Sequence, residues 1–432
     1  MKIGIVIFIL FISLVLRLHN YALYPQRGAT SDEYTYTFLG ISLIEEHVPI
    51  SWSFFPDYKN KRDLAIKKLY FPIVYPYFDH PPLNGLLIGG WSILNGQDSF
   101  EKVELRTIRL VPIFLSMVSS MLVFLLGLRL YGYKTGVWAL LIYTTTAIFV
   151  MNGRVVFAEN LLTPLFLGAI YLFSLYKNSL TKGRVIMLSV LSGLSFLTKE
   201  LGIAVFLSLL YLFISEKIKL KFILILIVIT GLFVLSYLAY GAYYDWGLFW
   251  KIVIGQSSRE VGPETLLMLT STPIVVNKIY YDGWYFFGFL CLFFGFAQYK
   301  ENKLFLVPSL VYFVLLIFSL TKIGEMGWYM IPLFPFMAIL SARALVRGFE
   351  KHNLFIFNLF LFVGLYEIKY LYGANFGLTT TQFRIIFMIM ILPLLLSLMF
   401  EKKQLFKIIG VTWFYLFIFG NILLTYNYIH PS

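Results

Sequence analysis

The chain has 432 residues, of which 59% are apolar, 19% aromatic and only 13% charged, and its mean hydropathy is +0.80. A soluble domain carries about 25% charged residues, so a soluble fold of this length would lack the polar side chains to cover its surface. The net charge of +13 comes from short Lys and Arg clusters between apolar runs. This pattern excludes nucleic acid as a partner and indicates membrane lipids instead.

Apolar runs in chain order predict an all-α fold, a polytopic bundle of about thirteen transmembrane helices in a single domain, 1–432. The predicted spans are 3–23, 109–130, 135–151, 159–176, 184–198, 201–215, 219–243, 279–298, 303–320, 328–346, 353–371, 380–400 and 405–426. Spans 184–198 and 201–215 are short and closely joined, so either could be tilted or re-entrant. No small-residue cleavage site follows the first span, which indicates that it is not a cleaved signal peptide.

The basic residues predict the orientation, because cytoplasmic loops retain Lys and Arg. With the N-terminus in the cytoplasm, every loop on that side carries at least two basic residues: Arg129 and Lys134; Lys177, Lys182 and Arg184; Lys217, Lys219 and Lys221; Lys300 and Lys303; Arg343, Arg347 and Lys351; Lys402, Lys403 and Lys407. Thirteen spans then place the C-terminus outside. Short loops and no appended domain favour a prokaryotic plasma membrane.

Two long connections lie on the predicted outer side, residues 20–108 and 244–278. Connections between packed elements are usually about 4–6 residues long, and much longer ones tend to be functional. Within the first loop, residues 34–47 predict an amphipathic helix at the membrane surface. Residues 83–95 predict a second helix that is too short to span the bilayer.

Asp32 and Glu33 follow the first span by about a dozen residues, in Thr30-Ser31-Asp32-Glu33-Tyr34. Adjacent carboxylates beside lipid are costly unless a cation, a proton or a hydrogen bond offsets the lost solvation. They are candidates for a catalytic general base or a cation ligand. Ser31 and Asp32 are also good N-cap residues for the helix that starts at Tyr34, and the two interpretations are compatible.

Asp79-His80-Pro81-Pro82-Leu83 is the most distinctive string in the loop. The two prolines restrict the backbone and hold the preceding residue extended, so His80 is presented in one direction. A plain turn before the 83–95 helix is the alternative, although such a turn needs neither Asp79 nor His80.

Further charged and aromatic residues lie at the outer ends of later spans. Arg154 and Glu159 form either a local ion pair or, through Arg154, a site for an anionic group. Lys199 lies on the side where Lys is disfavoured, which suggests phosphate binding, with snorkelling as the alternative. The remaining candidates for substrate binding are Arg259, Lys322, Trp328 and Tyr329, of which the aromatic pair could also belong to an interfacial belt.

The sequence carries no strong metal or cofactor signature. The five histidines lack metal-ligand spacing, and no glycine-rich phosphate loop is present. Asp32 and Glu33 could hold a divalent ion, but nothing in the pattern requires one. Cys291 is the only cysteine, so no intrachain disulfide can form.

The order of these motifs resembles that of the GT-C fold glycosyltransferases that use polyprenyl-phosphate sugars, the relatives of protein O-mannosyltransferases and lipid A aminoarabinose transferases. Asp32-Glu33 matches the acidic motif of their first outer loop, and His80-Pro81-Pro82-Leu83 matches the mannosyltransferase His-Pro-Pro-Leu. Leu197-Thr198-Lys199 is similar to a Leu-Thr-Lys-Gly element, except that Glu200 replaces the glycine. Trp328-Tyr329 with Pro332 and Pro335 is similar to a later tyrosine-proline motif.

The resemblance implies a hexosyl- or pentosyltransferase that moves a sugar from a polyprenyl phosphate to a hydroxyl of a protein or glycolipid acceptor outside the cytoplasm, with inversion. Asp32 would be the base, and Lys199, Arg154, Arg259 and Lys322 would be candidates for the phosphate, with His80 near either the acceptor or the phosphate. The alternative function is a lipid or solute transporter or flippase. Transporters usually place ionisable residues at mid-membrane in repeated halves, and neither feature is visible in this sequence.

Overall fold

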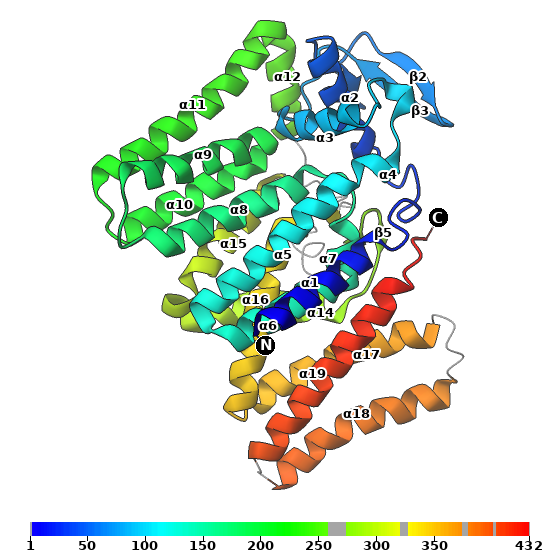
Figure 1. Ribbon diagram of the computed structural model, residues 1–432, viewed down its shortest axis with the longest axis vertical. Coiled ribbons are helices and arrows are strands. Elements are labelled where there is room, and N and C mark those ends of the chain that lie inside the picture. Colours follow the sequence, from blue (N-terminus) through cyan, green and yellow to red (C-terminus); the bar gives the residue numbers. More distant parts are fainter. Residues whose placement is uncertain (1, 258–273, 320–326, 374–378, 401–402, 432) are drawn as a thin grey trace.

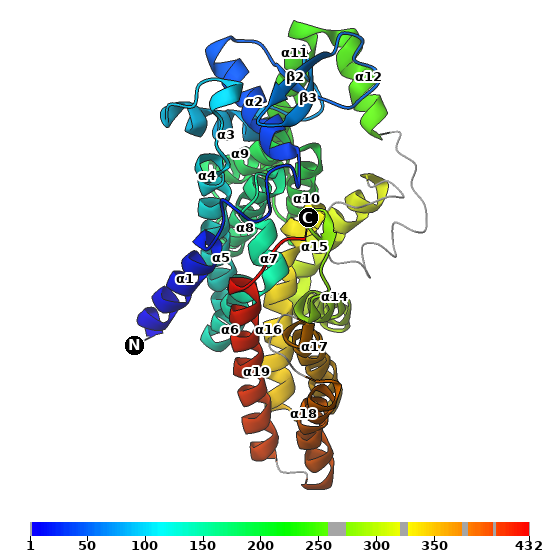
Figure 2. The same cartoon turned by 90° about the vertical axis from the view of Figure 1, so that its right-hand side faces the viewer.

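The computed structural model describes residues 2–257, 274–319, 327–373, 379–400 and 403–431, which form an elongated bundle of helices with a smaller cap at one end (Figure 1). Arg259 and Lys322 lie outside the described residues. A second view shows the cap, built mainly from residues 20–108, at one end of the bundle and α17 to α19 at the other (Figure 2). The all-α fold class is confirmed.

Each predicted span coincides with a helix or a pair of helices. Their bounds are α1 Lys2–Leu18, α5 Leu110–Tyr131, α6 Tyr133–Thr145, α7 Ala147–Asn152, α8 Ala158–Tyr176, α9 Lys182–Thr198, α10 Ile203–Ser215, α11 Leu220–Tyr244, α14 Gly283–Gly295, α15 Tyr299–Ser319, α16 Phe334–Glu350, α17 Leu354–Gly373, α18 Thr380–Phe400 and α19 Lys403–Tyr426. Within the described ranges, 6 helical stretches are long and apolar enough to cross a membrane, and four shorter apolar helices accompany them. The count of thirteen spans therefore stays a prediction.

The predicted span 135–151 is broken into α6 and α7 at Thr146, whose backbone is extended. The hydroxyls of Thr144, Thr145 and Thr146 each bond back to the carbonyl four residues earlier, at 2.7, 2.8 and 2.6 Å. Such back-bonding from consecutive threonines bends helices. The break turns the α7–α8 connection, with Arg154, towards the cap.

The cap contains a three-stranded antiparallel sheet that the sequence did not predict. Its strands are β1 Ser51–Trp52, β2 Arg62–Ile66 and β3 Leu69–Val74, in the order β1-β3-β2. The β2–β3 hairpin turns on Lys67 and Lys68, which both have positive φ, at 49° and 70°. Asn-Gly is the usual sequence for this turn, so two lysines gave no signal of a hairpin.

Two short helices of the cap, α2 (Asp32–Glu45) and α3 (Leu83–Leu94), confirm the helices predicted at 34–47 and 83–95. The predicted amphipathic exposure of the first is wrong, because every residue from Glu33 to Ser42 is buried. Glycines allow this close packing: a Cβ at Gly40 would lie 1.9 Å from the carbonyl oxygen of Gly85, and one at Gly89 would lie 2.4 Å from the carbonyl carbon of Gly40. The helices that carry Asp32 and follow His80 are thus in backbone contact.

The second long outer loop also folds against the cap. Its helix α12 (Trp246–Ser257) packs Phe249 and Ile252 into a cluster with Tyr77 and Phe78 of the first loop. Beyond the undescribed stretch, β4 (Ile274–Val275) and β5 (Lys278–Ile279) pair as a hairpin. The largest apolar core runs through the bundle below, so the cap is supported from one side by the predicted transmembrane helices.

Candidate active site

Residues from three distant parts of the chain meet between the cap and the bundle. Asp32 begins α2, His80 lies in the turn before α3, and Lys199 ends α9. Asp32 interacts electrostatically with His80, with Lys199 and with Glu159, the second residue of α8. Four of the residues that the sequence predicted for the site are thus brought together.

The adjacent carboxylates Asp32 and Glu33 have different surroundings. Glu33 is buried and accepts two hydrogen bonds from Arg109, at 2.8 Å from Nε and 2.7 Å from Nη2. The backbone N–H of Val156 donates to the same carboxylate at 3.3 Å. A bidentate, buried pair of this kind fixes geometry, so Glu33 joins the first outer loop to the start of α5 and to the α7–α8 connection.

Asp32 is half-buried and is the first residue of α2. The N-cap residue is Ser31, which makes no side-chain capping bond, and the N–H of Asp32 itself donates to Thr30 Oγ1 at 3.2 Å. Removal from solvent raises the pKa of Asp32 to about 6, although His80 and Lys199 lower it. A carboxyl with a pKa near neutrality suits proton transfer better than an ordinary aspartate does.

The Asp79-His80 pair does more than turn the chain. Tyr58 donates to the buried carboxylate of Asp79 at 2.8 Å, and the Asp79 carbonyl accepts a bond from Gln256 of α12. These contacts fix the turn from two sides. The ring of His80 stacks on Tyr36 with centroids 5.5 Å apart, and its Nδ1 lies 3.8 Å from a carboxylate oxygen of Glu200.

Lys199 is buried at the centre of the group. Its Nζ lies 2.5 Å from Glu159 Oε1 and 4.0 Å from the centroid of the Tyr329 ring. Burial alone would lower the pKa of Lys199, but the Glu159 carboxylate and Tyr329 hold it above its ordinary value. The ammonium group is therefore charged at neutral pH, and it is not a snorkelling lysine exposed at the membrane surface.

A cavity of about 300 Å³ opens beside these residues. It is lined by Phe78, His80, Lys199, Glu200, Leu201, Ile203, Val253, Gln256, Leu315, Phe318, Ser319 and Tyr329. One part of the wall is polar and carries His80 and Lys199, whereas the other is apolar and includes Leu315 and the exposed ring of Phe318. Asp32 does not line the cavity itself, but its neighbours His80 and Lys199 do.

Arg154 and Trp328 lie apart from the cavity lining. Arg154 is buried and donates to the carbonyl of His19 at 2.6 Å, and it makes no ion pair with Glu159 among the described contacts. Trp328 is buried against Phe157, with ring centroids 4.6 Å apart, so it does not belong to a lipid-facing belt. Arg154 and Trp328 therefore pack against other parts of the protein and do not line the cavity.

Sequence reasoning missed three residues of the site. Arg109 was treated only as the start of a span, although it is the partner of Glu33. Tyr36 and Tyr77 are buried near Asp32, and their hydroxyls have no partner among the described residues. Tyr36 follows Asp32 by four positions, so the helical period could have placed both on one face. No comparable signal indicated Tyr77 or Arg109.

The donor atoms present do not fit a divalent metal held by Asp32 and Glu33. Both oxygens of Glu33 are engaged by Arg109 and Val156. The described part of the chain contains no group of three or more His, Cys, Asp or Glu side chains that could hold a metal ion. What the arrangement does offer is two carboxyls with raised pKa values, Asp32 and Asp79, one buried cation and one imidazole beside an amphipathic cavity. This set suits proton removal from one group and charge stabilisation on another.

The sequence and the structure are both similar to known glycosyltransferases. A model of the dolichyl-phosphate-mannose-protein mannosyltransferase family matches residues 79–240, which include Asp79, His80, Arg154, Glu159 and Lys199. Among curated proteins, none matches the sequence at a significant level.

Solved structures with the same fold include ArnT from Cupriavidus metallidurans bound to undecaprenyl phosphate, with a TM-score of 0.57, 12% identity, and 98% of this chain and 76% of that chain covered. A second is the archaeal oligosaccharyltransferase AglB from Archaeoglobus fulgidus in complex with an inhibitory peptide and a dolichol-phosphate. Its TM-score is 0.53 and its sequence identity 13%, and the match covers 100% of this chain and 56% of that chain. A third is the arabinosyltransferase EmbB from Mycobacterium smegmatis, with a TM-score of 0.54 and 11% sequence identity. The match covers 96% of this chain and 41% of that chain. The resemblance to GT-C proteins is confirmed: this chain has their fold and is a multi-pass membrane protein.

Proposed function

We propose that this protein is a membrane glycosyltransferase that moves a sugar from a polyprenyl phosphate to a hydroxyl group of a protein or glycolipid. The observation that carries the proposal is the grouping of Asp32 with His80 and Lys199, two residues that line one amphipathic cavity. A polyprenyl-phosphate sugar needs apolar wall for its chain and a cation for its phosphate, and this cavity provides both.

The chemistry follows from the charges of the site. The ionised Asp32 carboxylate takes the proton of the acceptor hydroxyl, and the acceptor oxygen attacks the anomeric carbon of the sugar. The bond between that carbon and the phosphate oxygen breaks, and its electron pair leaves with the lipid phosphate. A single displacement of this kind inverts the anomeric configuration.

Lys199 is the group best placed for the leaving phosphate. Its charge is permanent at neutral pH, and it lines the cavity together with His80. Glu159 and Tyr329 fix its position in advance, so little reorganisation is needed as negative charge develops on the phosphate. Arg259 and Lys322 stay predictions from the sequence for the same role.

The charge pattern of the loops supports a cytoplasmic N-terminus and an active site on the outer side of the membrane. We extend the proposal to a single domain, 1–432, in a prokaryotic plasma membrane. Polyprenyl-linked sugars have their chain in lipid and their head group at the interface, so the proposal requires the cap and its cavity to lie at the outer surface of the membrane.

The experiment is sugar transfer in proteoliposomes that contain a radiolabelled polyprenyl-phosphate sugar and an acceptor. Asp32→Asn is expected to lower the rate about 10²- to 10⁴-fold, because it removes the base and keeps the shape of the side chain. Asp63→Asn, an exposed carboxylate in β2 of the same loop, is the matched control and is expected to have no effect.

Three outcomes separate the alternatives. Covalent sugar on the acceptor that depends on Asp32 supports the proposal. Movement of lipid or solute across the vesicle membrane without any product would identify a transporter and reject it. Full transfer by a correctly inserted Asp32→Asn variant would reject Asp32 as the base.

A further inference from the structure

A second cavity lies far from the proposed active site, at the other end of α16. Its volume is about 270 Å³. It is lined by Cys291, Phe294, Gly295, Gln298, Asn302, Leu340, Arg343, Ala344, Arg347, Gly348, Lys351, Asn353, Phe355 and Ile356. Arg347 follows the first residue of α16, Phe334, by thirteen positions, which is about 20 Å along the helix axis.

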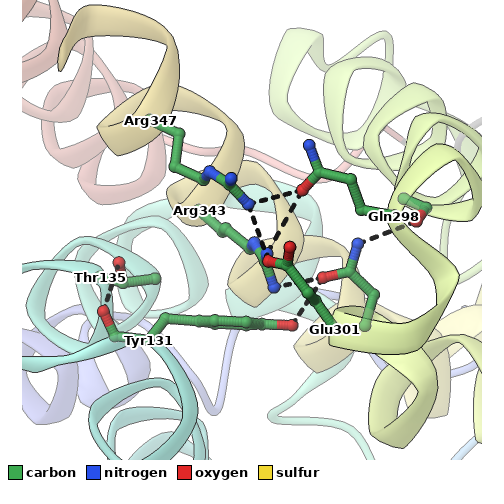
Figure 3. Close-up of polar contacts among 8 residues, drawn as sticks. Tyr131, Thr135, Gln298, Glu301, Arg343 and Arg347 are labelled. Carbon is green, nitrogen blue, oxygen red and sulfur yellow. Dashed lines mark hydrogen bonds and ion pairs between the residues drawn. The ribbon is translucent and has the colours of Figure 1, made fainter. Parts of the chain in front are cut away.

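Three cationic side chains line this cavity, namely Arg343, Arg347 and Lys351, and no carboxylate does. Figure 3 shows Arg343 and Arg347 reaching from α16 towards Gln298 and Glu301. Glu301 pairs with both arginines from outside the lining, and its side chain is 58% exposed. One carboxylate against three cations leaves an excess of positive charge at the cavity.

Arg343 is buried and held in a fixed position. It donates to Asn302, Gln298 and Glu301, and its guanidinium lies 4.0 Å from the centroid of the Tyr131 ring. Tyr131 in turn donates to Asn302 at 2.8 Å. A preorganised guanidinium loses little side-chain entropy when it meets an anion.

Arg347 and Lys351 remain available to a ligand. The hydrogen bonds from Arg347 to Gln298 and Glu301, at 2.6 and 2.9 Å, both come from Nη1. Its Nε and Nη2 are not engaged by any described residue, and its side chain is 34% exposed. Lys351 is exposed at the end of α16. A planar guanidinium with free N–H groups is suited to phosphate oxygens.

Much of the remaining wall is apolar, although Gln298, Asn302 and Asn353 also line it. Phe294 and Phe355 are 41% and 57% exposed and lie in edge-to-face contact, with ring centroids 5.5 Å apart. Phe294 lies near the end of the predicted span 279–298 and Phe355 lies near the start of 353–371, so both rings are expected at the depth of acyl chains near one leaflet. A free phosphate ion would make no use of these rings, whereas an anionic lipid would contact them with its chains.

We propose that this cavity binds the phosphate head group of an anionic phospholipid in the leaflet opposite the active site. The basic loops predict that this leaflet is the cytoplasmic one, where basic pockets between transmembrane helices bind anionic lipids. Topology alone requires only exposed basic residues in the loops. It does not require Arg343 to be buried behind a cavity and fixed by Tyr131, Asn302 and Glu301.

The test is lipid binding by the purified full-length protein in neutral detergent, measured by titration with dioleoyl-phosphatidylglycerol and, separately, with dioleoyl-phosphatidylcholine and inorganic phosphate. Saturable binding of phosphatidylglycerol alone is expected. An Arg347→Gln, Lys351→Gln double variant is expected to weaken it at least tenfold, since each charge near a lipid surface contributes about fivefold.

The matched control is the double variant Lys182→Gln, Lys219→Gln, which removes two exposed charges from the same predicted side and is expected to bind like the unaltered protein. Lys351→Glu, at an exposed helix end, provides the same test if the first double variant is recovered poorly. Equal weakening in the control would overturn the proposal, because binding would then be general electrostatic attraction. Binding of inorganic phosphate as tight as that of the lipid would overturn it in favour of a free anion.

Discussion

The contact between α2 and α3 makes a sharp prediction about two adjacent glycines. Gly89 faces α2, and a Cβ added there would lie 2.4 Å from the carbonyl carbon of Gly40. Gly90 lies where the two helices are further apart, and a Cβ added there would meet only the end of the Ile44 side chain of α2, at 3.6 Å, which is ordinary contact. Gly89→Ala should therefore disturb the site, and Gly90→Ala should not.

The size of the effect follows from the distances. Ordinary contact begins at 3.4 Å, so a Cβ at 2.4 Å requires α2 and α3 to separate by about 1 Å (3.4 − 2.4). Overpacking of this kind costs about 1–3 kcal/mol of stability. Because α2 begins with Asp32 and α3 follows His80, the separation also displaces two site residues, and a misplacement of 1 Å can lower a rate by about 10²-fold.

The assay is sugar transfer in proteoliposomes, together with thermal unfolding of the purified variants. Gly89→Ala is expected to insert and fold but to transfer about 100-fold more slowly. Gly90→Ala is expected to keep its rate and to gain up to about 1 kcal/mol from the better helix propensity of alanine. Equal rates for the two variants would refute the claim that backbone contact between these helices positions the site.

Four further predictions concern three side chains, Glu33, Asp32 and Glu200. Glu33→Gln leaves the buried Arg109 without its carboxylate and should lower the free energy of unfolding by about 3–5 kcal/mol. Asp32→Asn should not have this effect. Equal stability of the two variants would contradict an anchoring role for Glu33. Because the pKa of Asp32 is raised to about 6 and the base acts ionised, transfer should fall about tenfold for each pH unit below 6 and level off above it; a flat profile from pH 4.5 to 8 would exclude this base. The raised pKa also means that folding favours the protonated form of Asp32. Ionisation of Asp32 therefore lowers the stability of the folded protein as the pH rises from about 4 to 6, and this loss should be smaller in Asp32→Asn than in the unaltered protein. Glu200→Gly should keep the rate of transfer within about fivefold of the unaltered protein. The Glu200 carboxylate is 42% exposed and lies 3.8 Å from His80, and such solvent-exposed pairs contribute little. A hundredfold loss of rate would show that Glu200 takes part in the reaction.

Much of the fold could be predicted because lipid imposes a simple rule on sequence. Apolar runs of sufficient length must be helical, and every predicted span from 3–23 to 405–426 coincides with helix. The sequence also predicted the helices at 34–47 and 83–95, because each is a periodic or apolar run between prolines and polar residues. The spans also predict one membrane side for Asp32, His80 and Lys199, and this prediction grouped the three residues, which the structure brings together.

The pairing of side chains could not be predicted, because it depends on how distant helices cross. Lys199 pairs with Glu159 across 40 positions of sequence, and Glu33 pairs with Arg109 across 76. Local spacing instead suggested Arg154 as the partner of Glu159. The sheet of the cap was missed because its turn uses Lys67 and Lys68 in place of the usual turn residues.

The start of α2 has a consequence for how such a protein can diversify. Successive helical residues point about 100° apart, so Glu33 faces Arg109 while its neighbour Asp32 faces the histidine and the lysine. The position of Asp32, the proposed base, is therefore set largely by an anchored residue that is one peptide unit away. Strand β1 also holds the start of α2, because Trp52 donates to the carbonyl of Ser31 and Ser51 donates to the carbonyl of Thr35. Changes of length or sequence in the cap that spare these contacts can accordingly leave the Asp32 carboxylate where it is.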